Sequence, residues 1–287
     1  MLHLLKIELK KAFKSKLLLA SLLAASIIAI LCAIYNIQKV DLETEYYRRA
    51  IEISEAAINP EAPVYSLFNH WICEDFSSFL ASLFFLIFPI ISPLSYGWSF
   101  LAERKTGYVK NVLTRTEKWK YYAAKYAAVI ISGGAVLLIP IILNILIVSL
   151  FIPAVVPDIY YDTAYAVRMP SMFSHLFYTY PGWYMFLRVL LAFLFGGGLA
   201  ALSFSLAFFT SKHIVAVLLP FLLSLGLHYG ESIIPQEMQF GELSPFYIIS
   251  ANGTQLKILW VAIAELFIIY LLSLIPCIVK GKNEDVF

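Results

Sequence analysis

What this sequence has little of is charge. Only 14% of its 287 residues are charged, against about 25% in a typical soluble domain. By contrast, 61% are hydrophobic and 16% aromatic, and the mean hydropathy is +0.79. So few polar side chains cannot cover a surface in water. The composition therefore excludes an ordinary soluble domain and predicts an all-α integral membrane protein.

Cysteine is also scarce, because the chain holds only Cys32, Cys73 and Cys277. Three cysteines do not make a disulfide framework. Cys32 and Cys277 fall in apolar runs, where a thiol packs as a small hydrophobic side chain. A Cys32–Cys73 bridge is the alternative.

Catalytic and metal-binding motifs are missing. No G-x-x-x-x-G-K-[ST] loop is present, so the chain cannot hydrolyse ATP by that route, and neither H-E-x-x-H nor G-x-S-x-G occurs. The stretch "NHWICED" gathers His70, Cys73, Glu74 and Asp75 without a standard zinc spacing. We expect no catalytic residue, no metal and no cofactor in this chain.

What the sequence has in abundance is long apolar runs. A membrane-crossing helix needs about 20 mostly apolar residues, and six such runs lie near 17–37, 77–100, 126–151, 184–210, 213–229 and 256–279. The fifth is the shortest, which leaves its full crossing open. The first is too long for a cleaved signal peptide and lacks a clear cleavage site. The runs predict a six-span transmembrane domain over 17–279.

Basic residues are unevenly distributed between the segments that join these runs. Fifteen of the 21 fall on one side if the N-terminus is cytoplasmic. They are Lys6, Lys10, Lys11, Lys14, Lys16, Arg104, Lys105, Lys110, Arg115, Lys118, Lys120, Lys125, Lys212, Lys280 and Lys282. The positive-inside rule then predicts a multi-pass protein of the cell membrane, bacterial in character, with both termini and the tail 280–287 in the cytoplasm.

Three outer loops follow from this orientation. The acidic loop 38–76 carries a helical pattern in "DLETEYYRRAIEISEAAI" and forms either a cap over the spans or a gate. The loop 152–183 is rich in Tyr and Pro, which suits the membrane interface. The loop 230–255 is broken by prolines and glycines and predicts a re-entrant or interface-lying hairpin, whose backbone needs protein or water beside it.

The N-terminal segment 1–16 is amphipathic. Leu2, Leu5, Leu9 and Phe13 share one stripe, and lysines at i, i+4 spacing share another. We expect a separate helix in the membrane interface, with its lysines at anionic lipid headgroups. The alternative is a simple positive anchor for the first span.

A charged block, 101–125, separates the second and third spans. Gly107 breaks it, and "YVKNVLTR" after the glycine predicts a short helix with Val109, Val112 and Leu113 on one face. Its basic residues fit either a turn that fixes topology or a surface that a soluble partner grips. The residues alone do not separate these two interpretations.

The order of these features resembles the permease subunits of type 2 ABC exporters. The matching stretches are "IELKKAFKSK" at 7–16 and "AERKTGYVKNVLTRTEKWKYYAAK" at 102–125. The similarity extends over the whole chain in span count and loop placement and is most specific at 102–125. One departure is "TRTEKWK", where many relatives have a proline after the arginine.

This resemblance implies a coupling helix that docks on a separate ATP-hydrolysing subunit. It implies two copies of that subunit, which bind ATP and Mg²⁺, and a second permease, identical or homologous. Nucleic acid is not an expected partner, and short outer helices are implied within 230–255. The implied coupling residues are Glu103, Arg104, Lys105, Gly107, Val109, Lys110, Asn111, Leu113 and Arg115.

Polar residues inside the spans predict an intramembrane network. Glu265 and Arg188 fall at depths that differ by about 8 Å, so we expect them to pair, either as a structural lock or in substrate passage. Asn144 suits a hydrogen bond between helices. The runs "GGGLA" (196–200) and "GLHYG" (226–230) predict close helix packing, or a seam between two permeases.

The leading functional expectation is the membrane subunit of an ATP-driven exporter. Its cargo would be an amphipathic peptide such as a bacteriocin or lantibiotic, or a drug-like or lipid-like molecule, with antibiotic resistance or self-protection as the result. Alternatives are an intramembrane enzyme and a non-transporting membrane sensor or scaffold. Co-purification with a soluble ATPase would separate the first from the other two.

Overall fold

Long helices dominate the architecture. The computed structural model describes residues 1–54, 65–160, 165–231, 233–235, 241–253 and 256–283, and within these ranges the chain is helical without any strand. Six helices are long and apolar enough to cross a membrane, which confirms the predicted all-α, six-span fold. They are α2 (Lys16–Ser54), α4 (Phe79–Tyr96), α7 (Lys118–Ser149), α9 (Pro181–Leu206), α10 (His213–Glu231) and α12 (Leu259–Asn283).

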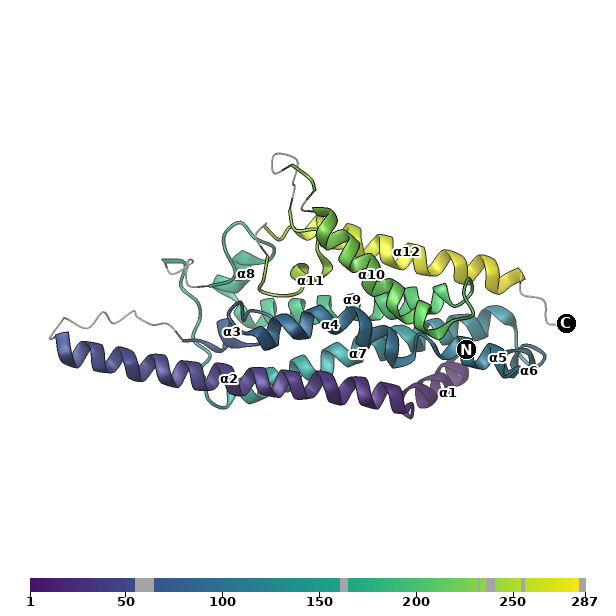
Figure 1. Cartoon of the computed structure of the whole chain (residues 1–287), viewed down its shortest axis with the longest axis horizontal. Coiled ribbons are helices and arrows are strands. Elements are labelled where there is room, and N and C mark those ends of the chain that lie inside the picture. The colour runs from purple at the N-terminus through teal and green to yellow at the C-terminus, as the bar shows by residue number, and fades with distance from the viewer. Residues whose placement is uncertain (55–64, 161–164, 232, 236–240, 254–255, 284–287) are drawn as a thin grey trace.

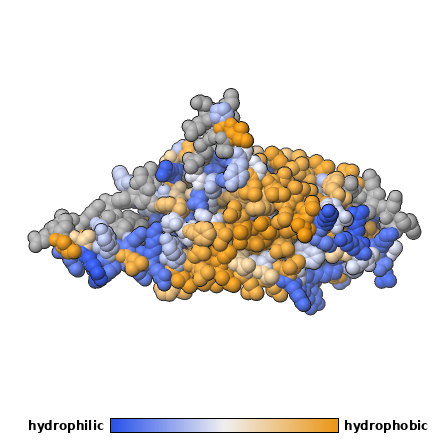
Figure 2. Space-filling model, in the orientation of Figure 1, coloured by the Kyte–Doolittle hydropathy of each residue, from blue (hydrophilic) through white to orange (hydrophobic). Residues whose placement is uncertain are grey.

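The short helices gather at the two ends of the bundle (Figure 1). One end, here called the basic end, holds α1 (Leu2–Phe13), α5 (Ser99–Lys105) and α6 (Tyr108–Leu113). The other, the loop end, holds α3 (Leu67–His70), α8 (Ser174–Thr179) and α11 (Pro245–Ile248). Figure 2 shows an apolar band between the ends and hydrophilic atoms concentrated at both, as a membrane-embedded bundle requires.

The first span is longer than its apolar run. The run predicts a helix near 17–37, but α2 extends 39 residues to Ser54 and includes the first part of the predicted loop. The extension contains no proline or glycine, and Glu45 pairs with Arg49 one turn later at 2.8 Å. Hydropathy therefore marks where the apolar part of the helix ends, while the helix itself continues.

Glycines allow α7 and α9 to cross closely. A Cβ atom on Gly133 would lie 2.3 Å from the Cβ of Ala200 and 2.9 Å from the carbonyl oxygen of Gly196. Small residues at such crossings bring backbones together where lipid supplies no hydrophobic driving force. The packing predicted for 196–200 is confirmed. The packing predicted for 226–230 is wrong for the described part of the chain, since no described atom beyond the chain neighbours and the backbone of the same helix lies within 4 Å of a Cβ added at Gly226 or Gly230.

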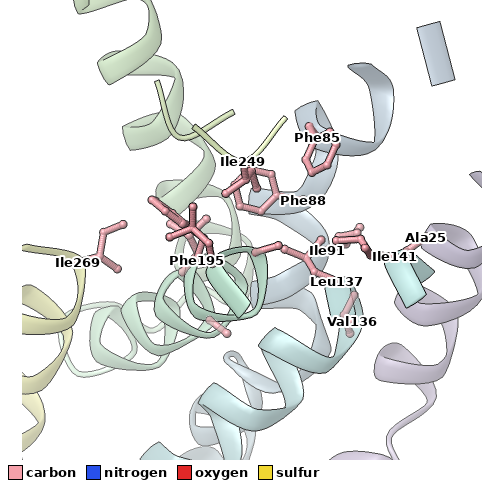
Figure 3. Packing of buried hydrophobic residues seen from close by; sticks show 14 of the residues in the cluster. Ala25, Phe85, Phe88, Ile91, Val136, Leu137, Ile141, Phe195, Ile249 and Ile269 are labelled. Atoms are coloured by element: carbon pink, nitrogen blue, oxygen red, sulfur yellow. The ribbon is translucent and has the colours of Figure 1, made fainter. Parts of the chain in front are cut away.

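Around this crossing the core is built from large apolar side chains, seen from close by in Figure 3. Phe88 of α4 and Phe195 of α9 are fully buried, and Ile249, from the chain after α11, packs into the same cluster. A segment of the predicted 230–255 hairpin is therefore part of the core.

Candidate functional site

The charged block folds as two short helices at the basic end. α5 ends at Lys105, Gly107 turns the chain, and α6 begins at Tyr108. Gly107 has φ +73°, in the left-handed region that favours glycine, so the break predicted there has a conformational cause. The short helix predicted from "YVKNVLTR" is present over Tyr108–Leu113.

The nine predicted coupling residues divide into two sides. Five side chains are exposed and mostly basic: Arg104, Lys105, Lys110, Asn111 and Arg115. Val109 is buried, and Leu113 packs against the core. A partner could therefore reach the five exposed residues, whereas the expectation that Val109 contacts a partner is wrong for this conformation.

Glu103 also points into the protein. Its carboxylate lies 2.9 Å from the ammonium of Lys125 on α7 and accepts a hydrogen bond from the Tyr121 hydroxyl at 2.8 Å. This residue connects α5 to the third span and is not free to bind another subunit through its carboxylate.

Lys125 is the centre of a buried ionic cluster, formed by Glu8, Lys11, Tyr96, Glu103, Tyr121 and Lys125. The Lys125 side chain is fully buried. Its ammonium lies 2.9 Å from each of three oxygens, on Glu8, Glu103 and Tyr96. An ammonium group has three donors, so these acceptors satisfy it completely. The cluster joins α1, α4, α5 and α7.

Glu8 brings the N-terminal helix into this cluster. It accepts hydrogen bonds from Lys11 at 2.8 Å and from the Tyr96 hydroxyl at 2.9 Å. Burial alone raises the pKa of the Glu8 carboxyl, but the attraction of Lys125 and the hydrogen bonds of both lysines outweigh burial and hold the pKa below its usual value. The exposed Lys6, Lys10 and Lys14 agree with the predicted basic stripe, while Glu8 locks the other face to the bundle.

The sequence offered weak indications of this cluster. Glu8 is the single acidic residue of the lysine-rich segment 1–16, and Lys125 interrupts an apolar and aromatic run. Charge counting places Lys125 among the basic residues that set the topology, but a fully buried lysine does not face a lipid headgroup. Charge counting alone cannot distinguish the two environments.

At the loop end, Arg188 binds a different partner from the predicted one. Its guanidinium donates to Glu74 at 3.1 Å and to the backbone carbonyls of Ile248 and Ser250 at 2.6 and 3.2 Å. Glu74 also accepts from the Tyr184 hydroxyl at 2.7 Å. The predicted Glu265–Arg188 pair is therefore wrong: Arg188 binds Glu74, from the segment before α4, and two backbone carbonyls from the segment after α11.

Asn144 is likewise separate from Arg188 and Glu265. Its amide donates to the carbonyl of Ala29 at 2.9 Å and accepts from the Ile72 backbone at 2.9 Å. The expected hydrogen bond between helices is confirmed, since Asn144 joins α7 to α2. The three residues do not form the single network that the sequence predicted.

The "NHWICED" stretch is held by protein groups. Glu74 binds Arg188, and Asp75 accepts from Asn36 at 2.9 Å. In the described part of the chain, no three His, Cys, Asp or Glu side chains come together in a way that could hold a metal. Cys32, Cys73 and Cys277 are all buried and free, so the Cys32–Cys73 bridge is not formed.

Comparison with known proteins adds no assignment to this geometry. No protein-family model, no curated protein and no solved structure matches the chain. The geometry itself shows an all-α bundle with six helices that are long and apolar enough to cross a membrane. It also shows a basic, exposed α5–α6 surface that is anchored by a buried ionic cluster.

Proposed function

We propose that this chain is the membrane subunit of an ATP-driven exporter and that a separate ATPase binds the α5–α6 surface. The observation that carries the proposal is the two-sided character of α5–α6. Outside, Lys110, Asn111 and Arg115 are exposed; inside, Glu103 is bonded to the third span. A surface that is both accessible and firmly attached suits the transfer of force to membrane helices.

The attachment gives a route for that force. Displacement of α5 acts through Glu103 and Lys125 on α7, and through Lys125 and Glu8 on α1. α7 in turn crosses α9 closely at Gly133 and Gly196. A rigid shift of these packed helices would rearrange the bundle far from the nucleotide, which is the type of coupling that packed interfaces permit.

Membrane orientation and cargo belong to the same proposal. With the basic end in the cytoplasm, α5–α6 faces the compartment that holds ATP. Export as the direction of transport rests on the resemblance to type 2 exporters. An amphipathic peptide, drug-like or lipid-like cargo suits the apolar bundle. The intramembrane-enzyme alternative would need paired catalytic groups within the spans, and Asn144 is already bonded to the backbone of Ala29 and Ile72.

Co-expression with candidate ATP-binding subunits of the source organism tests the proposal. The tagged full chain is purified, and bound ATPase and ATP hydrolysis are measured. We expect one ATPase to co-purify in a one-to-one ratio. Reversing two exposed charges, Lys110→Glu with Arg115→Glu, should lower its recovery at least tenfold.

A matched control reverses two exposed arginines at the opposite end of the bundle. Arg48→Glu with Arg49→Glu changes charge equally and should leave ATPase binding intact. Equal loss in both double variants, or no bound ATPase with the native chain, would contradict the proposal. A membrane sensor or scaffold would give the second result.

A further inference from the structure

An apolar groove opens on the bundle surface between α10 and α12, which both lie along the upper side of the bundle in Figure 1. Its volume is about 530 Å³, within the range of small-molecule sites. Leu199 and Leu202 of α9 line it from the buried side, while Leu227 and Ile268 are exposed at its rim. Because the rim is apolar and faces outward, the groove opens toward the lipid region, within the apolar band of Figure 2.

One charged side chain, Glu265 of α12, lines this groove among the described residues. Glu265 is 9% exposed, and both of its carboxyl oxygens are buried without a hydrogen-bond partner in the described structure. Leaving a buried carboxyl unbonded costs free energy. The groove therefore contains an acceptor for which no described residue of this chain supplies a partner.

A carboxyl group bonds most strongly to a donor that carries positive charge. The groups that act most strongly on Glu265 are two further carboxyls, Glu231 and Glu242, both buried. Arg188 and Lys257 are engaged elsewhere, because Arg188 binds Glu74 and Lys257 donates to the carbonyl of Ser250. An ammonium group would meet the two unbonded carboxyl oxygens of Glu265 at one end of an apolar groove.

We propose that this groove binds a hydrophobic amine that enters from the bilayer. The ammonium group donates to Glu265, and the apolar body lies between α10 and α12. Glu265 is about 9 Å along α12 from its first residue, Leu259. That depth favours a free single-chain amine over the headgroup of a bilayer lipid. The inference goes beyond the proposed function, since binding requires no ATPase.

Photolabelling of the full chain in phosphatidylcholine nanodiscs tests the site. The probe is dodecylamine with a diazirine in its alkyl chain, compared with the matching alcohol at equal membrane concentration. We expect the amine to label peptides of α10 and α12 saturably and at least ten times more efficiently than the alcohol. Mass spectrometry identifies the labelled peptides.

Three variants separate charge from shape. Glu265→Gln should reduce amine labelling about tenfold, to the level of the alcohol, and Glu265→Asp should retain the preference for the amine. Ala264→Phe should reduce labelling by both probes, because Ala264 lies in the middle of the α12 stripe that lines the groove. Glu117→Gln, an exposed carboxyl outside the groove, is the control and should change nothing.

Several results would overturn the inference. Equal labelling by amine and alcohol would show that the charge of the ammonium group does not contribute to binding. Unchanged labelling of a folded Glu265→Gln protein would show that Glu265 does not bind the amine. If Glu265→Gln fails to fold, loss of the amine preference in Glu265→Asp would contradict the inference equally. Competition by phosphatidylethanolamine would overturn the assignment to a free amine. Because no ATPase is present, each result is independent of the proposed exporter function.

Discussion

The ammonium of Lys125 lies 2.9 Å from a carboxylate oxygen of Glu8, which precedes it by 117 residues. This contact fastens the N-terminal helix to the third span inside the protein, at a site from which water is excluded. Glu103 shares the same ammonium. Glu8 of α1 and Glu103 of α5 thus share one cation of α7, and movement of either short segment can be transmitted to the third span through it.

Removal of this cation should be costly. Lys125→Met leaves Glu8 and Glu103 buried without their shared partner, and breaking a buried ion pair in this way costs about 3–5 kcal/mol. We expect the variant to unfold at a markedly lower mole fraction of SDS in a detergent titration. Lys120→Ala is the control: its partially exposed pair with Glu117 should contribute less than about 1 kcal/mol. Equal losses in both variants would argue against the cluster.

The α7–α9 crossing predicts a contrast between two glycines. Gly133→Ala should destabilise the bundle by about 1–3 kcal/mol, because its new Cβ would collide with Ala200. Gly226→Ala should be neutral or stabilising by up to about 1 kcal/mol, since alanine favours helix and no described atom beyond the backbone of α10 lies within 4 Å of the new Cβ. The same SDS titration measures both. A similar response at the two positions would mean that α7 and α9 do not approach as described.

Arg188 should be sensitive even to a conservative change. Arg188→Lys retains the charge but cannot reach Glu74 and both backbone carbonyls together, and each buried carbonyl left unbonded costs about 1–3 kcal/mol. We expect amide hydrogen exchange of 245–250 to accelerate at least tenfold. Arg168→Lys, at an exposed site in the neighbouring loop, should leave that exchange unchanged. Unaltered exchange in Arg188→Lys would contradict the proposed support of the hairpin.

The hairpin should also respond to pH through Glu242. Burial, followed by the charge of Glu231, raises the pKa of the Glu242 carboxyl from 4.5 to about 8. Between these values the folded protein holds a proton that the unfolded chain has released, so stability falls as pH rises, by at most about 1.4 kcal/mol per unit. Glu242→Gln should remove this contribution, and the difference from native stability should grow between pH 5 and 7.

Lys257 interacts with the charge of Glu242 and limits the pH range over which the measurement reports on Glu242. Burial lowers its pKa to about 7, so its proton is lost from the folded state only above that pH, and its contribution to stability then rises with pH. Stability measured from pH 5 to 7 in both proteins therefore reports on Glu242. A constant difference over that range would show that Glu242 titrates equally in the folded and unfolded states.

The helices were predictable because their causes are local. Apolar runs of about 20 residues require helical crossings in lipid, since only a helix satisfies its own backbone there. The break in the charged block was likewise predictable from Gly107, because a glycine favours a turn. The helical pattern from Asp41 was predicted within the outer loop, but its continuity with the first span was missed, because hydropathy changes at the membrane boundary whereas helix propensity continues to Ser54. The glycines at 196–200 predicted packing but could not identify Gly133 as their partner.

The polar partners were much less predictable. Depth along two spans suggested that Glu265 would meet Arg188, but depth is one coordinate and ignores rotation about the helix axis. It also ignores chain segments that fold back, such as the carbonyls of Ile248 and Ser250. The hydrogen bond of Asn144 to another helix was predictable, because a buried amide on a span needs a partner. The sequence did not identify Ala29 as that partner.

By itself the sequence determined that this chain is helical, suited to a membrane and basic at one end, because composition and periodicity act over a single helix and its solvent. Only the tertiary structure decided which charges meet. Charge counting predicts that Lys125 is a surface charge, but it is buried and links several helices, and Glu265 lines an open groove with no hydrogen-bond partner among the described residues. The physical reason is that ion pairing depends on distances of a few ångströms between helices far apart in the sequence, and these distances follow from packing.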